Sequence, residues 1–136
     1  KKKINNLKMK QIIFFHGGID DENEIAKIAN NSSIFIYPGS VGLSLIHAMA
    51  YGLPVIIHDN EYHHMPEIAA FENNYNGLFF KENSAIDLAN VLVNLMKAET
   101  LREKMSVNSI KKLNNNFNTE NMSIRFQSFL NNLFNS

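Results

Sequence analysis

The residues best suited to chemistry lie in three short loops rich in Gly, His and Asp, at 16–20, 38–42 and 58–65. In the second loop, Gly39 and Gly42 allow the backbone to approach a ligand closely, because neither carries a Cβ. A helix predicted to begin near Leu43 would direct its free N–H groups and the positive end of its dipole into this loop. This arrangement is typical of an anion site, most often a phosphate site. Because many α/β proteins contain such a loop, it does not identify a function by itself.

The hydrophobic pattern predicts the elements that position these loops. Buried strands are predicted at 11–15, 34–37, 55–58 and 77–80, separated by helices. This alternation indicates an α/β fold: a doubly wound, Rossmann-like parallel sheet of at least four strands with flanking helices and a helical C-terminus. The predicted helices lie at about 20–30, 43–50, 66–71, 84–96, 99–114 and 119–133. Ligands bind beyond the carboxyl ends of the strands in such sheets, so we expect the three loops on one rim.

Composition limits the classes of function. A chain of 136 residues is expected to form one domain, 1–136, and its formal net charge of zero argues against nucleic acid as a partner. The absence of cysteine excludes disulfides and thiolate metal sites and makes a cytoplasmic location the default expectation. The lysine-rich residues 1–10 are expected to be frayed. The polar start without a Met suggests a piece of a longer protein.

Two other chemistries fit the residues poorly. His58, Asp59, His63 and His64 could suggest a metal site, but their spacing is not that of a regular one. We therefore expect a solvated loop there and no bound metal or other cofactor. A serine nucleophile is also disfavoured, because residues 39–42 are one residue short of a Gly-x-Ser-x-Gly elbow.

Residues 12 to about 97 resemble the C-terminal half of a GT-B glycosyltransferase of the large retaining family 4. The resemblance rests on FFHGGIDDENEIAKIANNSSIFIYP, on HAMAYGLPVI and on MPEIAAFENNYNGLFF, in the family's order and spacing. The family's usual block reads Glu-Ala-Met-Ala-x-Gly-x-Pro-Val-Ile. Here His47 stands at the position of the family's ribose-binding Glu, and Gly39 stands at that of a second, upstream Glu. The family's diphosphate-binding Arg and Lys have no match in residues 1–11.

The resemblance implies a site for a nucleotide-sugar donor. The Gly loop and the start of its helix would hold the donor phosphates, and His47 would bond to a hydroxyl group; a core histidine is the alternative. The loop at 16–18 would pass backbone groups to a nucleobase, unless it is only a tight turn. Glu67 would lie near the donor sugar, although stabilisation of its own helix would also explain it. The expected donor-binding residues are His16, Gly17, Gly18, Gly39, Ser40, Val41, Gly42, Leu43, Ser44, His47 and Glu67.

The leading hypothesis is therefore the donor-binding domain of a retaining hexosyltransferase, which moves a sugar from a nucleoside diphosphate to an acceptor hydroxyl, for example in polysaccharide biosynthesis. It would be inactive without an N-terminal acceptor-binding domain of the same parent chain. Peripheral membrane association of that full-length enzyme is left open. The alternatives are a non-catalytic nucleotide-binding or regulatory module of the same fold and a flavodoxin-like interaction domain.

The last predicted helix is unusually apolar for a chain end. We expect its large side chains to pack on the core; the alternative is that they cover the other half of a longer enzyme. These side chains are Phe126, Phe129, Leu133 and Phe134.

Overall fold

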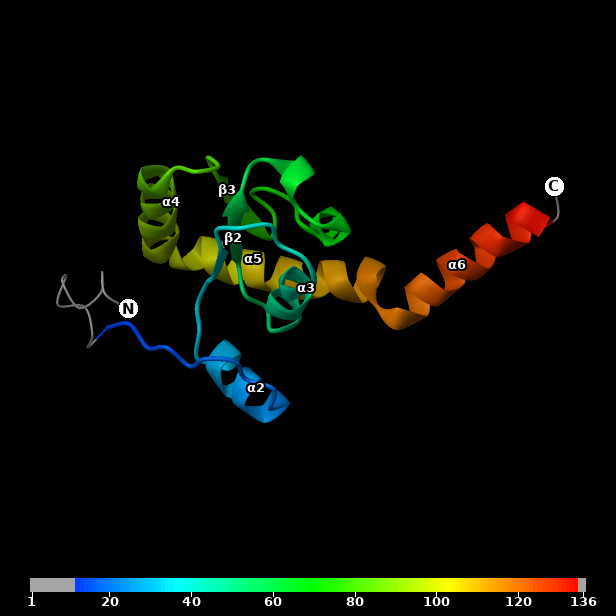
Figure 1. Cartoon of the computed structure of the whole chain (residues 1–136), viewed down its shortest axis with the longest axis horizontal. Helices are drawn as coiled ribbons and strands as arrows, with labels where there is room; N and C mark the ends of the chain where they lie inside the picture. Colours follow the sequence, from blue (N-terminus) through cyan, green and yellow to red (C-terminus); the bar gives the residue numbers. More distant parts are fainter. Residues whose placement is uncertain (1–11, 135–136) are drawn as a thin grey trace.

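The computed structural model describes residues 12–134, so the expectation for residues 1–10 lies outside the described residues. Helices and three strands alternate along the chain (Figure 1). In chain order the elements are α2 (Glu22–Asn30), β1 (Phe35–Tyr37), α3 (Leu43–Ala50), β2 (Val55–His58), η1 (Glu61–His63), η2 (Pro66–Ala70), β3 (Gly77–Phe80), α4 (Ala85–Lys97), α5 (Glu99–Lys112), η3 (Leu113–Phe117) and α6 (Thr119–Phe134).

The strands form one parallel sheet in the order β1-β2-β3, with Ile56 of β2 paired to both Ile36 and Leu78. This confirms the α/β class with a parallel sheet, flanking helices and a helical C-terminus. The expectation of at least four strands is wrong for the described residues, because 12–20 form neither strand nor helix. The sheet of the described residues contains β1, β2 and β3 alone, and residues 12–15 are not one of its strands.

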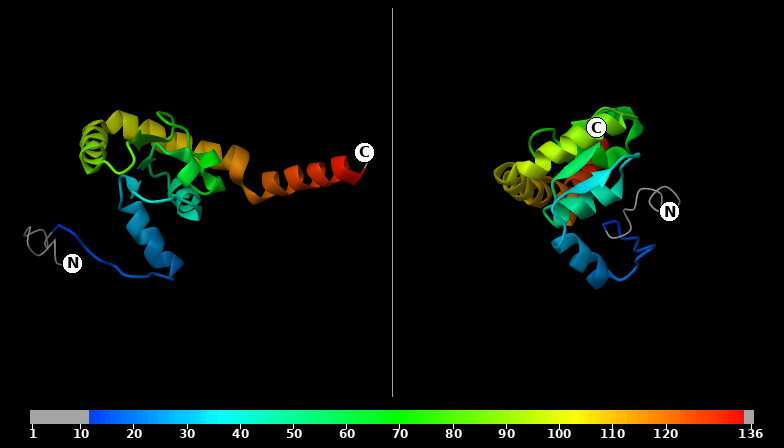
Figure 2. Two further views of the ribbon diagram at one scale, coloured as in Figure 1. Left: turned by 45° about the horizontal axis from the view of Figure 1, so that its top comes forward. Right: turned by 90° about the vertical axis from the view of Figure 1, so that its left-hand side faces the viewer.

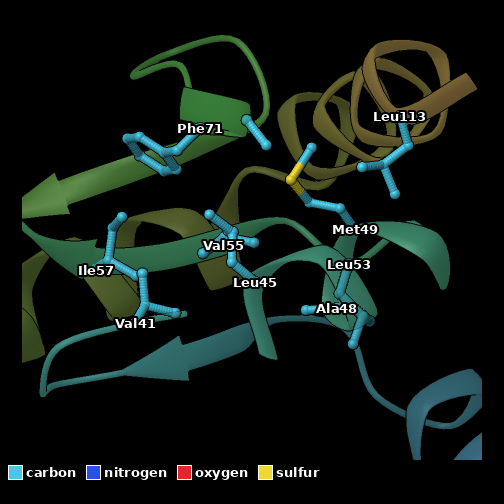
Figure 3. Packing of buried hydrophobic residues seen from close by; sticks show 10 residues of the cluster. Val41, Leu45, Ala48, Met49, Leu53, Val55, Ile57, Phe71 and Leu113 are labelled. Atoms are coloured by element: carbon cyan, nitrogen blue, oxygen red, sulfur yellow. The ribbon is translucent and has the colours of Figure 1, made fainter. Parts of the chain in front are cut away.

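Strand β2 lies at the centre of the sheet and is buried on both faces, as its uninterrupted apolar sequence predicts. On one face, Val55 and Ile57 pack with residues of α3 and with Phe71 (Figure 3). On the other face, Ile56 packs with Phe80 of β3, and residues of α4 and α5 complete that cluster. Two apolar layers thus hold β2 in place, and its carboxyl end, His58, is fixed with it.

The ends of the helices show why the chain turns where it does. The side chain of Asp21 accepts a hydrogen bond from the amide of Asn23 at 2.8 Å, and Ser84 caps α4 through the amide of Asp87 at 3.2 Å. Gly52, with φ of +67°, ends α3 and donates its N–H to Met49 O. By contrast, the first residue before α3, Gly42, has no side chain with which to cap that helix.

The position of α6 corrects a prediction. The four large side chains expected on the core, Phe126, Phe129, Leu133 and Phe134, are each more than half exposed, and α6 has no buried residue. After η3 the chain changes direction, and α6 runs away from the sheet in Figure 1 and in the left-hand view of Figure 2. Within residues 12–134, Leu113 and Phe117 are the last members of the core cluster around β2 and α3. No helix in the described part of the chain has the length and apolarity needed to cross a membrane.

Candidate functional site

The turn between β1 and α3 presents open backbone donors. The described residues contain no hydrogen-bond partner for the amides of Gly42, Leu43 and Ser44, and Gly42 makes no side-chain cap. Its carbonyl accepts from the amide of Leu45 at 2.9 Å, which begins the helical pattern. Gly39 and Ser40 precede them on an exposed stretch. The turn therefore offers unpaired N–H groups at the positive end of α3, where a negative group is stabilised.

Val41 differs from its neighbours in the turn. It is fully buried, its N–H donates to Nδ1 of His64 at 3.1 Å, and its carbonyl accepts from the amide of Met65 at 2.9 Å. Both backbone groups are thus in use inside the protein, and its side chain belongs to the core. In this structure the Val41 N–H is not available to a ligand, and a donor contact at Val41 stays a prediction.

Glu67 reaches the same turn from η2. Its Oε2 lies 3.8 Å from the position that a Cβ on Gly42 would occupy, and Met65 Cγ lies 3.3 Å from that position. Oε2 is buried and has no hydrogen-bond partner among the described residues. A buried carboxylate oxygen without a partner is costly unless something donates to it. Glu67 therefore places a buried carboxylate oxygen without a partner beside the start of α3.

Ser44 and His47 lie on another side of α3. Together with Ile25 of α2 and Phe35 of β1 they line a mostly apolar cleft of about 310 Å³ between α2 and α3. His47 is exposed, which contradicts the alternative of a core histidine. Gly42 and Glu67 are thus side by side, whereas His47 borders the neighbouring cleft.

The loop at 16–18 stays apart from the turn. His16, Gly17 and Gly18 are exposed, and Gly17 has a φ of +76°, which glycine adopts without strain. Ile19 lines the α2–α3 cleft, but none of these three residues does. A contact between residues 16–18 and a nucleobase stays a prediction.

A histidine cluster beside the turn corrects part of the expectation of a solvated loop, because His58 is buried whereas Asp59 and His63 are exposed. The ring of His58 is 2% exposed and stacks on His64, with centroids 3.9 Å apart and planes 18° from parallel. The Nε2 of His64 lies 2.9 Å from the carbonyl oxygen of His58. The only signal in the sequence was that His58 ends a strand that is apolar on both faces. No group of three metal-binding side chains is found within residues 12–134.

Glu82 contacts two residues in the outer part of this cluster, His63 and Asn60. Its carboxylate lies 2.6 Å from Nδ1 of His63 and accepts from Nδ2 of Asn60 at 3.0 Å. Hydrogen bonds from His63 and then Asn60 lower the pKa of Glu82. Burial, followed by repulsion from His64, lowers the pKa of His58, whose Nδ1 has no partner within hydrogen-bond distance. The cluster therefore holds an anionic Glu82 at its edge and a neutral His58 inside.

A family model described as glycosyl transferases group 1 matches residues 1–112. The chain belongs to this family. The match confirms the expected resemblance to GT-B glycosyltransferases, and the solved structures of similar fold agree with it. A search of curated proteins gives no match.

Three of the solved structures illustrate the shared fold. Sucrose-phosphate synthase from Thermosynechococcus elongatus has a TM-score of 0.81 at 20% identity, over 98% of this chain and 33% of that one. The C-terminal domain of the group 1 family protein LpcC from Francisella tularensis has a TM-score of 0.73 at 24% identity, over 87% of this chain and 60% of that one. Anabaena HepE in complex with UDP has a TM-score of 0.74 at 17% identity, over 93% of this chain and 34% of that one. This member of the group 1 family thus spans about a third of two of these chains.

Proposed function

We propose that this chain is the donor-binding domain of a glycosyltransferase and that it binds a nucleoside diphosphate sugar at the start of α3. The observation that carries the proposal is the set of unpaired amides at Gly42, Leu43 and Ser44 beside the unpaired carboxylate oxygen of Glu67. Membership of the group 1 family supports it, as does the UDP present in the HepE complex.

The backbone amides and the Glu67 carboxylate would bind different parts of the donor. The amides and the positive end of α3 would hold the diphosphate, and Gly39 and Ser40 would flank it. The negative charge of Glu67 would repel a phosphate, so its oxygen would instead accept a hydrogen bond from a sugar hydroxyl. His47, at the edge of the α2–α3 cleft, would bond to a further hydroxyl group.

Transfer itself would be driven by charge stabilisation. Negative charge grows on the diphosphate as its bond to the sugar breaks, and preorganised N–H donors lower that barrier; in other enzymes, loss of one such donor costs about 2.7–4 kcal/mol. The reaction would be a retaining transfer of a hexosyl group, as in family 4, without a bound metal. It would require an acceptor-binding N-terminal domain of a longer, cytoplasmic protein, and this chain alone would be inactive.

Titration of the isotope-labelled protein with UDP, GDP, ADP and uridine tests the proposal by NMR. We expect at least one diphosphate to shift the amides of Gly42, Leu43 and Ser44, whereas uridine, which lacks the diphosphate, binds far more weakly. Absence of any shift at these residues at millimolar nucleotide would reject donor binding.

A second candidate is a non-catalytic nucleotide-binding module. It is favoured by Gly39 and His47, which stand where the resemblance places two glutamates. Nucleotide binding is expected in both cases, so the distinction needs a transfer assay on the longer parent protein. Release of the nucleoside diphosphate coupled to formation of a glycoside would support the enzyme, and tight binding without turnover would support the module.

A further inference from the structure

His64 connects two elements that border the proposed donor site. Its ring stands between the amide of Val41, in the β1–α3 turn, and the carbonyl of His58, at the end of β2, at 3.1 and 2.9 Å. The next residue, Met65, donates its own amide to Val41 O. Residues 64 and 65 thus hold the backbone of Val41 on both sides, immediately before Gly42.

The two contacts determine the protonation of the ring. Val41 N–H is a donor, so Nδ1 of His64 must be the acceptor and must carry no proton. Nε2 then carries the hydrogen and donates it to His58 O. Only the neutral Nε2–H tautomer makes both bonds. A proton added at Nδ1 would leave two N–H groups facing one another and leave the buried Val41 amide without an acceptor.

We propose that His64 is a positioning residue that, as the neutral Nε2–H tautomer, holds the β1–α3 turn in its ligand-binding form and releases it on protonation. This proposal rests on the proposed function, because the form it maintains is the one whose amides would bind the donor. With Val41 held, the unpaired amides of Gly42, Leu43 and Ser44 are held at the start of α3. Residues 64 to 67 also carry Met65 and Glu67 to the turn, so one ring positions both the donors and the carboxylate.

Other titratable groups surround the two stacked rings. His58 stacks directly on His64, and burial, followed by repulsion from His64, lowers the pKa of His58. Further out, Glu82 lies 4.0 Å from Nδ1 of His58 and pairs with His63, and Asp59 also acts on His58. The nearby acidic groups therefore contact His58 and His63, and the hydrogen-bond partners of the His64 ring are the backbone of Val41 and of His58.

Two substitutions of His64 test its two hydrogen bonds separately, because each keeps one bond and removes the other. In His64→Asn, Oδ1 replaces Nδ1 at the same distance from Cβ, so the acceptor for Val41 is kept without a titrating group. In His64→Gln, Nε2 of the amide replaces ring Nε2, so the bond to His58 O is kept and the acceptor for Val41 is lost. His63→Asn is the control, because His63 is exposed and contacts Glu82 and Asn60 instead of the turn.

UDP is the probe, and its dissociation constant is measured from about pH 7.5 to about pH 5, the range in which histidine titrates. Protonation of the UDP phosphate also weakens binding in this range, because its second pKa is about 6. Beyond that, we expect the affinity of the unaltered chain to fall about two- to tenfold on acidification, the equivalent of one lost hydrogen bond. His64→Asn is expected to bind within about twofold of the unaltered chain at pH 7.5 and to keep only the pH dependence that the UDP phosphate causes. His64→Gln is expected to bind weakly at every pH, and His63→Asn to retain the normal profile.

A measurement without nucleotide makes the two proposals distinguishable. Two-bond ¹H–¹⁵N spectra give the tautomer of His64, and the Val41 amide shift is expected to change with the same midpoint as that ring. This needs no variant, so it decides the matter even if a substitution unfolds the chain. The positioning role would be overturned if the Val41 amide shift did not change as His64 takes up a proton. It would also be overturned if a folded His64→Gln variant bound UDP as tightly as the unaltered chain. If UDP fails to bind at any pH while the Val41 titration is seen, the donor-binding function fails and the contact itself stands.

Discussion

Replacing Gly42 with alanine is expected to separate binding from folding. The new Cβ would stand 3.3 Å from Met65 Cγ, 3.4 Å from Met65 Cβ and 3.8 Å from Glu67 Oε2. Met65 is 55% exposed and flexible, so it can yield by the few tenths of an ångström required. The methyl group would then occupy the space between the turn and Glu67, into which a sugar hydroxyl would have to enter.

The magnitudes follow from these contacts. The φ of Gly42 is −135°, outside the left-handed region, so alanine carries no penalty of that kind. The poorer helix cap and the smaller entropy of the unfolded chain act in opposite directions, and the free energy of unfolding should change by less than about 1 kcal/mol. A lost hydrogen bond to the carboxylate of Glu67 is worth about 1.5–3 kcal/mol, so binding of a nucleotide sugar should weaken about ten- to 150-fold.

Calorimetric titration with UDP-glucose and UDP-N-acetylglucosamine, combined with a urea denaturation curve, measures both quantities. UDP is the control ligand, because it lacks the sugar and should lose less affinity than the better of the two sugar nucleotides. If Gly42→Ala binds that sugar nucleotide like the unaltered chain, the space beside Glu67 is not used for a ligand. A large loss of stability would show instead that Met65 cannot move, and that the reasoning about packing is incorrect.

Three further predictions concern the framework around the site. Gly77→Ala would place a Cβ 2.2 Å from Val55 O, so we expect β3 to separate from β2. Overpacking and weakened hydrogen bonds between the two strands should lower the free energy of unfolding by about 2–4 kcal/mol, measured by urea denaturation. A decrease below about 1 kcal/mol would contradict the close approach of the strands. Folding lowers the pKa of His58, so the unfolded chain binds more protons near the usual pKa of 6.5, and the free energy of unfolding should fall as pH drops below that value. Denaturation of His58→Phe should lack this part of the pH dependence. An unchanged pH profile in His58→Phe would exclude His58 as its source. Arg102 of α5 donates to the carbonyls of Leu95 and Met96 at the end of α4, so Arg102→Ala should lower the free energy of unfolding by about 1–2 kcal/mol, measured by thermal unfolding. Lys104 is an exposed residue of α5, and Lys104→Ala should change the stability little. Equal losses in the two variants would contradict the capping role of Arg102.

Much of the fold could be predicted because its signals are local. Strands 55–58 and 77–80 are confirmed with their predicted limits, since a short apolar run between turn residues has few alternatives. Helix α3 is confirmed from Leu43 to Ala50, with Gly52 and Pro54 as its end signals. Helix α4 begins at Ala85, within the predicted range of 84–96. These features depend on residues within a few positions of one another.

The wrong predictions depended on partners that local sequence cannot supply. An apolar run at 12–15 and an amphipathic α6 each indicate a buried surface, but not what covers it, and the described chain does not bury either. The pairing of Val41 with His64 and the approach of Glu67 to Gly42 join residues more than 20 positions apart. They arise from the parallel arrangement of β1 and β2, which places the loop after each strand at one edge.

A crystal structure of this chain with bound UDP would test the central claim most directly. The account predicts that the β-phosphate lies within hydrogen-bond distance, about 2.7–3.2 Å, of the amide nitrogen of Leu43 or Ser44, with the Val41 amide still bonded to His64. A nucleotide bound on another face of the sheet, or a turn whose amides stay turned away from the diphosphate, would contradict it.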